Sequence, residues 1–287
     1  MATKGFLKTV PAGYLWRGVI LFSALACLFL VSWISRKEAP QPPPPSQFTG
    51  QAFLEPEPQP APPAPPSENV PASVYAQPSK DRPPSPPEVP LRRVKGAGKK
   101  VALTFDDGPC PQWTEKYLQV LREHQVKATF FMIGTQVEAQ PHLVKAVLEE
   151  GHEVGNHSWQ HGYMAKMSAQ ALQEDFSRAR SSLEKAGVKP RYFRPPYCSY
   201  SPAVLSLAEK EGQLVVLWDV DTRDWTRPSP QVIVDNVLNN VQEGSIILFH
   251  EGKPGTLEAL PRVIKELKVR GYEMVTLSQL MAAAEGR

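Results

Sequence analysis

The chain has 287 residues, which is enough for one full domain together with additional segments. Its formal net charge is +3, and the basic residues form no concentrated stripe or motif, which argues against a nucleic-acid-binding protein. Three cysteines are too few for a small secreted scaffold built on disulfide bonds.

An apolar run, residues 18–35, lies near the start of the chain with basic residues on both sides. As a helix it spans roughly 27 Å, at about 1.5 Å per residue, which approaches the hydrocarbon thickness of a bilayer. A cleaved signal peptide is the rival interpretation, but the small-residue site from Ala24 to Ala26 lies inside the run, where cleavage is disfavoured. We therefore expect an uncleaved, single-pass transmembrane signal anchor in the cell membrane. Residues 1–17 would lie in the cytoplasm and the folded domain outside it, in the periplasm or cell wall.

Residues 36–98 form a proline-rich segment, since 19 of the 31 prolines lie between Ala39 and Pro90. Such runs favour extended polyproline II and do not build a packed core, so a disordered linker is predicted. We expect this linker to act as a spacer between the membrane and the domain that follows. The basic cluster from Arg92 to Lys100 is interpreted as a solvated domain edge or as a contact for an anionic wall polymer.

From residue 99 to residue 287, short apolar runs alternate with amphipathic helical patterns. Several runs are almost wholly apolar, as is typical of strands buried on both faces. The helical patterns begin at Ser or Pro and stop at Gly, as Ser201–Pro202 and Gly212 illustrate. The alternation predicts parallel βαβ units, and about seven parallel strands favour a distorted (β/α) barrel of the α/β class. The predicted strands are Val101–Phe105, Ala128–Ile133, Glu153–Asn156, Arg191–Phe193, Leu214–Trp218, Ser245–Phe249 and Met274–Leu277.

Polar side chains follow the ends of five of these predicted strands. In a parallel barrel the carboxyl ends of the strands meet at one rim, and that rim carries the active site. We therefore expect residues far apart in the sequence to converge on one cleft. They are Asp106 and Asp107, His157 and His161, Arg194 to Tyr197, Asp224 and Trp225, and His250.

His157 and His161 have the spacing of a metal-ligand pair. Four residues apart on a helical turn, two imidazoles face the same way and reach one ion. One carboxylate from Asp106 or Asp107 completes a His-His-Asp set, and three protein ligands leave a position open for water, as a catalytic site needs. The alternative is a pair of unrelated surface or core histidines.

Two further segments provide partners for this chemistry. Arg194 can clamp a carboxylate and Tyr197 can present its backbone amide to an oxyanion, although by itself their Arg-Pro-Pro-Tyr sequence is a rigid loop. An aspartate near His250 would raise the pKa of its imidazole and keep it a proton donor. Alternatively, His250 is an ordinary hydrogen-bonded histidine at a strand end. Trp225 can form an apolar wall of the site.

Five segments of the chain, in chain order, resemble the motifs of the polysaccharide deacetylase family. They are Thr104–Pro109 (TFDDGP), His157–His161 (HSWQH), Arg194–Tyr197 (RPPY), Trp218–Trp225 (WDVDTRDW) and Ile247–His250 (ILFH). The family is also called carbohydrate esterase family four, or the nodulation-B homology domain. The resemblance runs from about Lys99 to Leu280, essentially the whole predicted domain. It implies a distorted (β/α) barrel and the hydrolysis of N-acetyl groups on sugar polymers.

The resemblance also implies a role for each site residue. The implied catalytic residues are Asp106 as general base, Arg194 to orient it, His250 as general acid, Asp224 as its partner, and Tyr197 through its backbone amide. The implied ligands of a divalent metal, usually Zn²⁺ and sometimes Co²⁺ or another ion, are Asp107, His157 and His161. The residues implied to contact substrate are Tyr197, Trp225 and Leu248.

One position departs from the family pattern. The family commonly has glycine after the RPPY segment, whereas this chain has Cys198, and Cys110 follows the TFDDGP segment. If Arg194 holds Asp106, the two loops are neighbours, and outside the cytoplasm a Cys110–Cys198 disulfide would persist. The sequence leaves this bridge and two unpaired thiols as open alternatives, because it gives no Cα distances. The substitution also bears on the loop at Tyr197, because glycine adopts a positive φ more readily than cysteine.

We therefore expect a metal-dependent polysaccharide deacetylase. Peptidoglycan N-acetylglucosamine is the favoured substrate, because the anchor and spacer would tether the domain near the wall. The enzyme alternatives are a chitin or poly-N-acetylglucosamine deacetylase and an acetyl-xylan esterase, and the non-enzyme alternative is a catalytically silent wall-binding protein. The expected partners are the N-acetylated glycan and the membrane, without nucleic acid. No protein partner is predicted, and a monomer is assumed.

Overall fold

The structure is a computed structural model that describes residues 89–286. The predicted cytoplasmic segment, the anchor at residues 18–35 and most of the proline-rich linker lie outside the described residues. Within residues 89–286, no helix is both long and apolar enough to cross a membrane.

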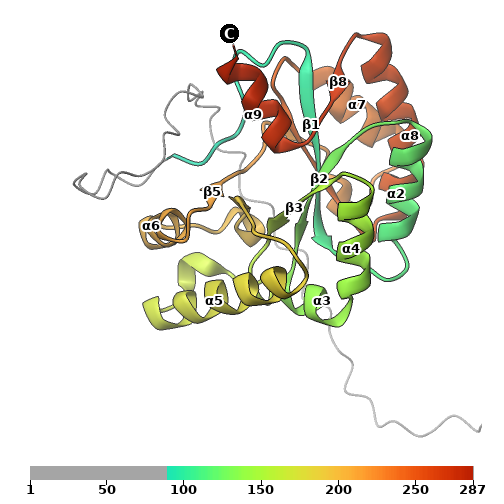
Figure 1. Cartoon of the computed structure of the whole chain (residues 1–287). Coiled ribbons are helices and arrows are strands. Elements are labelled where there is room, and N and C mark those ends of the chain that lie inside the picture. The colour runs from blue at the N-terminus through green and yellow to red at the C-terminus, as the bar shows by residue number, and fades with distance from the viewer. Residues whose placement is uncertain (1–88, 287) are drawn as a thin grey trace, which may run out of the picture. The chain divides into compact units, whose positions relative to one another are not determined.

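The described part of the chain contains one sheet of eight strands, all paired in parallel (Figure 1). The strand order is β5-β4-β3-β2-β1-β7-β6, and β8 pairs with β1. No strand pair in the described residues joins β5 to β6, so the sheet is a distorted half-barrel. The strands are β1 Lys100–Gly108, β2 Ala128–Met132, β3 Glu153–Asn156, β4 Tyr192–Phe193, β5 Leu214–Val215, β6 Val220–Asp221, β7 Ile246–His250 and β8 Glu273–Met274.

The α/β class and the parallel strands are confirmed, with two differences from the predicted elements. The predicted strand Leu214–Trp218 ends at Val215, and the chain returns to the sheet as the two-residue β6, which was not predicted. The predicted strand Met274–Leu277 ends at Met274. Thr276 instead caps a helix, because its side chain accepts from the Gln279 amide in a capping box.

Helices cover the sheet on its outer side. In Figure 1, α2, α4, α7 and α8 lie along one side of the central strands, and α5 and α6 lie on another. The α-helices are α2 Thr114–Glu123, α3 Gly134–Ala139, α4 Pro141–Glu149, α5 Ala169–Lys185, α6 Pro202–Lys210, α7 Pro230–Asn240, α8 Pro254–Val269 and α9 Leu277–Glu285. The short 3₁₀ helices are η2 Met164–Lys166, η3 Pro196–Cys198 and η4 Asp224–Thr226. The sequence signals for helix starts act as expected at Ser168 and Ser201, whose side chains accept backbone amides of the first turn.

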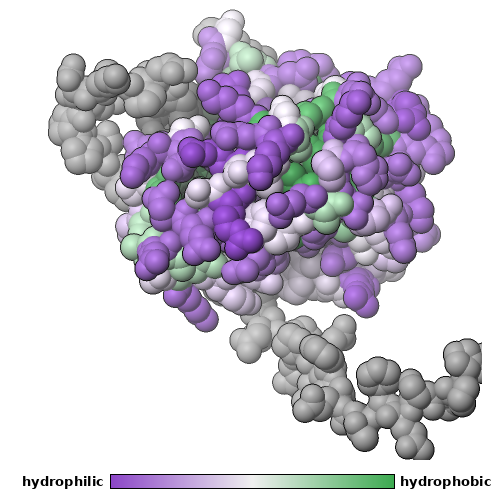
Figure 2. Space-filling view, turned by 60° about the horizontal axis from the view of Figure 1, so that its bottom comes forward, coloured by the Kyte–Doolittle hydropathy of each residue, from purple (hydrophilic) through white to green (hydrophobic). Residues whose placement is uncertain are grey.

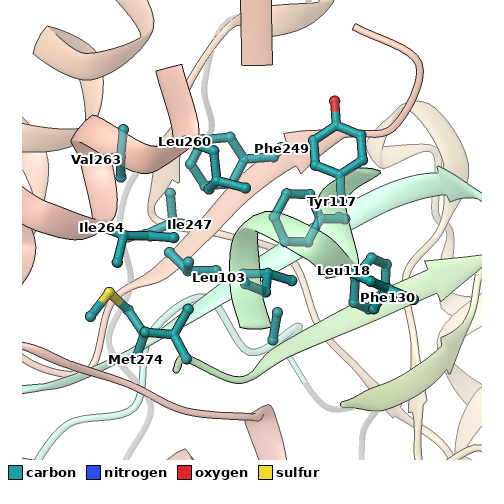
Figure 3. Close-up of a cluster of buried hydrophobic side chains, with 14 of the residues drawn as sticks. Leu103, Tyr117, Leu118, Phe130, Ile247, Phe249, Leu260, Val263, Ile264 and Met274 are labelled. Atoms are coloured by element: carbon teal, nitrogen blue, oxygen red, sulfur yellow. The ribbon is translucent and has the colours of Figure 1, made fainter. Parts of the chain in front are cut away.

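Side chains along β1 point alternately to the hydrophobic core and to the inner face that carries the site. Leu103 and Phe105 belong to the hydrophobic cluster between the sheet and helices α2, α4, α7 and α8 (Figure 3). Ala102 belongs to a second cluster that includes α9. Because successive side chains of a strand point to opposite faces, Thr104 and Asp106 share the inner face with Ala102. The fold therefore places α9 under one end of the inner face and Asp106 at the other.

The outer surface has few large exposed hydrophobic residues. Hydrophilic residues cover most of the face shown in Figure 2, and hydrophobic residues gather in small areas. Among the described residues, the exposed large hydrophobic side chains are Val89, Tyr163, Tyr197, Val232 and Val269. Two of them, Tyr163 and Tyr197, stack on each other and form one exposed aromatic patch.

The segment before β1, residues 91–97, is part of the folded domain and is called the strap here. Leu91, Val94 and Ala97 are buried, and Leu91 bridges to Val216 in parallel. The Val94 amide donates to the Gly244 carbonyl, and a Cβ at Gly244 would lie 1.7 Å from the Val94 carbonyl oxygen. The predicted linker end at residue 98 is therefore too late, because apolar residues among the basic ones pack into the core.

Leu91→Ala tests whether the strap stabilises the domain. Leu91 is 1% exposed, so its truncation should lower the free energy of unfolding by about 2–5 kcal/mol. Chemical denaturation followed by tryptophan fluorescence measures this loss. Lys95→Ala, at an exposed position in the same strap, should change stability by less than about 0.5 kcal/mol. Equal stability of Leu91→Ala and Lys95→Ala would contradict the role of the strap.

Candidate active site

Asp107, His157 and His161 converge at the carboxyl ends of β1 and β3. One ligand atom from each lies within 4.8 Å of the others. Asp107 Oδ1 is 3.1 Å from His161 Nε2 and 3.6 Å from His157 Nε2. Ligand atoms bound to a tetrahedral zinc at about 2.0–2.1 Å lie roughly 3.3 Å apart, so these separations match one ion.

The loop that carries the two histidines is not the helical turn that the spacing predicted. Residues 157–161 are irregular, and Ser158 and His161 have φ values of 66° and 59°. The loop is fixed by side chains, because Asn156 Oδ1 accepts the Ser158 amide and Asp175 Oδ1 accepts the Trp159 amide. The two imidazoles therefore meet through a tightly held loop.

The chemistry of these three residues fits a divalent cation. Asp107 Oδ1 is buried and makes no hydrogen bond of regular geometry, although it lies beside both rings. Burial alone would raise the pKa of Asp107, but the facing imidazoles bring it well below its usual range, so the carboxyl is ionised. His157 Nδ1 lies 2.7 Å from the Arg194 carbonyl, which leaves Nε2 as the atom that faces Asp107.

Asp106 is held by a fully buried Arg194. Arg194 Nη1 donates to Asp106 Oδ1 at 2.8 Å and to Thr104 Oγ1 at 2.9 Å. The other guanidinium nitrogens donate to the carbonyls of Val216 and Leu217. A guanidinium with partners on three sides fixes the direction of the Asp106 carboxylate, whose Oδ2 lies 3.8 Å from His157 Nε2.

His250 is the register partner of Asp106 on the neighbouring strand β7. Its Nδ1 lies 2.6 Å from Asp224 Oδ1, and its backbone amide donates to Asp224 Oδ2 at 2.8 Å. Burial would lower the pKa of His250, but the Asp224 carboxylate outweighs burial and raises this pKa to about 9. At neutral pH the imidazole is therefore protonated, as a proton donor must be.

The remaining residues implied by the resemblance differ in exposure. Tyr197 is 50% exposed and has φ 56°, and Cys198 has φ 55°, so a cysteine adopts the left-handed conformation that favours glycine. Trp225 is half-buried in η4, next to Asp224. Leu248 is 2% exposed and shares the inner face of β7 with His250. Tyr197 is thus the most exposed of the three.

Sequence reasoning missed one buried acid that braces the site, Glu251. Its amide donates to the Asp106 carbonyl, and its Oε2 accepts from Thr114 Oγ1 at 2.5 Å. Its Oε1 lies 2.0 Å from where a Cβ of Gly108 would be, so the glycine after Asp107 makes room for this carboxyl. Burial raises the pKa of Glu251 to about 7. Its place directly after His250 puts it near the site, but its bracing role depends on contacts with Thr114 and Gly108 that the sequence alone does not give.

Cys110 and Cys198 are both free thiols in the structure, which agrees with the second of the two alternatives that the sequence leaves open. They have separate surroundings: Cys110 Sγ contacts the Asp107 carbonyl and Gln136 Oε1, whereas Cys198 hydrogen-bonds with the Arg92 side chain. Arg194 does join the two loops, but through Asp106 and not through the cysteines.

Comparison with known proteins gives the class of this fold and site. The family model described as polysaccharide deacetylase matches residues 93–216, which identifies a carbohydrate deacetylase. A peptidoglycan-N-acetylglucosamine deacetylase of Bacillus cereus is 42% identical over 188 residues, which cover 64% of this chain and 88% of that relative. The chain therefore belongs to the polysaccharide deacetylase family.

Other relatives agree with this family and add detail. The chain is 38% identical to the peptidoglycan-N-acetylglucosamine deacetylase PgdA of Listeria monocytogenes, over 68% of this chain and 41% of that protein. A solved peptidoglycan N-acetylglucosamine deacetylase in complex with an N-hydroxybenzamide ligand superposes with a TM-score of 0.64 at 36% identity, covering 66% of this chain and 91% of that one. A CE4-family pseudoenzyme from Bacillus anthracis superposes with a TM-score of 0.65 at 32% identity, covering 69% of each chain.

Mass mapping under non-reducing conditions should find Cys110 and Cys198 unlinked. Burial raises the pKa of the Cys110 thiol to about 12, so it stays protonated and reacts slowly with alkylating reagents at pH 8 until the chain is unfolded. A peptide pair joined through these two cysteines, found in native protein, would contradict the structure.

The pH dependence of the rate should report the His250–Asp224 pair. Because the acid must be protonated, kcat should fall as pH rises through about 9. In Asp224→Asn the carboxylate is lost, so this alkaline limb should move toward or below pH 6.5 and kcat at neutral pH should fall about 100-fold. Asp235→Asn is the matched control, because the exposed Asp235 accepts from the Gln231 side chain on α7 and does not contact the imidazole, so its alkaline limb should stay near 9. If the alkaline limbs of the pH–rate profiles were identical in the two variants, Asp224 would be excluded as the cause of the raised pKa of His250.

Proposed function

We propose that this protein is a metal-dependent hydrolase that removes N-acetyl groups from peptidoglycan N-acetylglucosamine, with Zn²⁺ as its ion and Co²⁺ as a substitute. The observation that carries the proposal is the meeting of Asp107, His157 and His161 beside Asp106 and His250, which are partners in strand register. Amide hydrolysis of this kind needs ligands for a metal ion, a carboxylate that accepts a proton and a protonated imidazole that donates one.

The chain's own residues account for the proton transfers. When bound, a divalent cation polarises the acetamide carbonyl and increases the acidity of water. Asp106, oriented by its hydrogen bond from Arg194, accepts a proton from the water that attacks the carbonyl carbon. The Tyr197 amide donates to the oxygen that becomes negative. As the C–N bond breaks, His250 protonates the leaving amine, so acetate and a free amino sugar are released.

The choice of substrate rests on relatives and on the predicted N-terminal segments. Relatives named as peptidoglycan-N-acetylglucosamine deacetylases support it, and a membrane anchor with a spacer would keep the domain near the wall. A Bradyrhizobium chitooligosaccharide deacetylase is 38% identical over 63% of this chain and 90% of its own length, which keeps chitin-type glycans as the second candidate substrate. We propose the same tethered, extracytoplasmic location, with a monomeric chain.

A silent wall-binding protein is the alternative that the pseudoenzyme relative raises. A mutant of that pseudoenzyme with restored enzymatic activity superposes with a TM-score of 0.65 at 34% identity. In this chain the base, the acid and all three implied ligands are present and converge. We therefore favour an active enzyme.

Acetate release from peptidoglycan, chitin oligomers and acetylated xylan tests the proposal. Peptidoglycan should give the highest kcat/KM, chelator should abolish release, and Zn²⁺ or Co²⁺ should restore it. Asp106→Asn should lower kcat by about 100-fold or more, because it removes the proton acceptor. Glu174→Gln, an exposed carboxylate on α5, is the matched control and should match wild type.

Each result in this screen separates one part of the proposal. Equal rates for Asp106→Asn and wild type would refute the base, and full activity in chelator would refute the metal. A preference for chitin oligomers would refute peptidoglycan as the substrate, but it would not contradict the proposed deacetylation mechanism.

A further inference from the structure

The two histidines of the metal-ligand cluster are held in different ways. His157 is 3% exposed, and its Nδ1 faces a backbone carbonyl, that of Arg194, at 2.7 Å. His161 is 23% exposed, and its Nδ1 lies 3.1 Å from the Tyr197 hydroxyl. A ligating histidine needs a partner on its second nitrogen to fix the tautomer and the ring direction. For His161 that partner is a side chain at the surface.

Tyr197 is in turn held by another exposed ring. Tyr163 stacks on it with centroids 4.2 Å apart and an interplanar angle of 15°, and Lys166 Nζ lies 5.1 Å from the centroid of Tyr163. The Tyr197 ring also meets the His161 imidazole, with centroids 4.6 Å apart and an interplanar angle of 64°. These contacts make a continuous stack from the ligand cluster to the surface, called the tyrosine stack here and defined by His161, Tyr197 and Tyr163.

The exposure of the tyrosine stack is unusual for apolar side chains. Tyr163 and Tyr197 are 48% and 50% exposed, although burial of either ring would be favourable. Two of the three members of the stack, His161 and Tyr197, have left-handed backbone, with φ values of 59° and 56°. Strained residues persist where the surrounding structure holds them, and they cluster at functional sites. The stack is therefore a specific arrangement and not a chance surface contact.

We infer that Tyr197, through its hydroxyl, and Tyr163, through its ring, are positioning residues that set the affinity of the site for its metal ion. The inference rests on the proposed function, because it assumes that His161 ligates the ion. His161 Nδ1–H donates to the Tyr197 oxygen, which leaves the Nε2 lone pair directed at the side where Asp107 Oδ1 lies, 3.1 Å away. Tyr163 stacks on the Tyr197 ring and holds it in edge contact with the imidazole. This role of the Tyr197 side chain is additional to that of its backbone amide.

Zinc affinity, measured by competition with a chromophoric chelator, tests the inference on the full chain without an activity assay. Tyr197→Phe keeps the ring and the backbone amide and removes only the acceptor, so Kd for Zn²⁺ should rise about ten-fold. Tyr163→Ala should raise Kd by a similar factor, whereas Tyr163→Phe should leave it unchanged, since stacking needs no hydroxyl. Tyr272→Phe is the matched control, because this hydroxyl faces the Val241 carbonyl, away from the ligand cluster.

The absorption spectrum of the Co²⁺ form adds a second readout. The ligand-field bands should shift in Tyr197→Phe and Tyr163→Ala, and not in Tyr163→Phe or Tyr272→Phe. A zinc affinity of Tyr197→Phe within two-fold of wild type, with an unchanged cobalt spectrum, would overturn the role of the hydroxyl. Equal losses in Tyr163→Phe and Tyr163→Ala would overturn the role of stacking.

His161→Ala and Asp107→Asn separate this inference from the proposed function. If both lose zinc binding while Tyr197→Phe retains it, the metal site stands and the positioning role fails. If both retain full zinc affinity, the metal site itself fails, and with it the proposed hydrolase chemistry.

Discussion

A single buried cation, the guanidinium of Arg194, organises the site. Removing a charge from water costs several kcal/mol unless hydrogen bonds and opposite charge compensate, so every group around Arg194 is constrained. It bonds to Asp106 and Thr104 on β1 and to two carbonyls that follow β5, and it lies over the ring of Phe131. The backbone carbonyl of Arg194 faces the ring of His157. Through its side chain Arg194 fixes Asp106 and links strands that are distant in the sequence, and through its backbone carbonyl it contacts His157, a candidate metal ligand.

The parallel register of β1 and β7 fixes the position of His250, the proposed acid, relative to Asp106. Thr104 pairs with Leu248 and Asp106 with His250, so the proposed base and the proposed acid project from adjacent strands at the same height. Asp224, in the loop after β6, then bonds both the ring and the backbone of His250. The distance between Asp106 and His250 is therefore set by the sheet, and loop motion does not easily change it.

The sequence predicted the framework of the fold and the residues of the site, because both depend on local patterns. Apolar strands, serine caps and polar residues at strand ends are short-range signals. What it missed depends on contacts between distant segments. Two-residue strands such as β6 are too short to show a period, and the apolar residues of the strap lie among basic ones. The bracing role of Glu251 and the separate surroundings of Cys110 and Cys198 exist only once loops are placed together.

The strap has a further consequence for the open edge of the half-barrel. An open sheet presents unpaired amides and carbonyls at its edge, which recruit strands from other molecules. Leu91 donates to the Val215 carbonyl and accepts from the Leu217 amide, so the strap occupies the backbone groups at the β5 edge. Chains cut beyond residue 91 would leave that edge uncovered. The strap is therefore a guard against intermolecular strand addition as well as a part of the core.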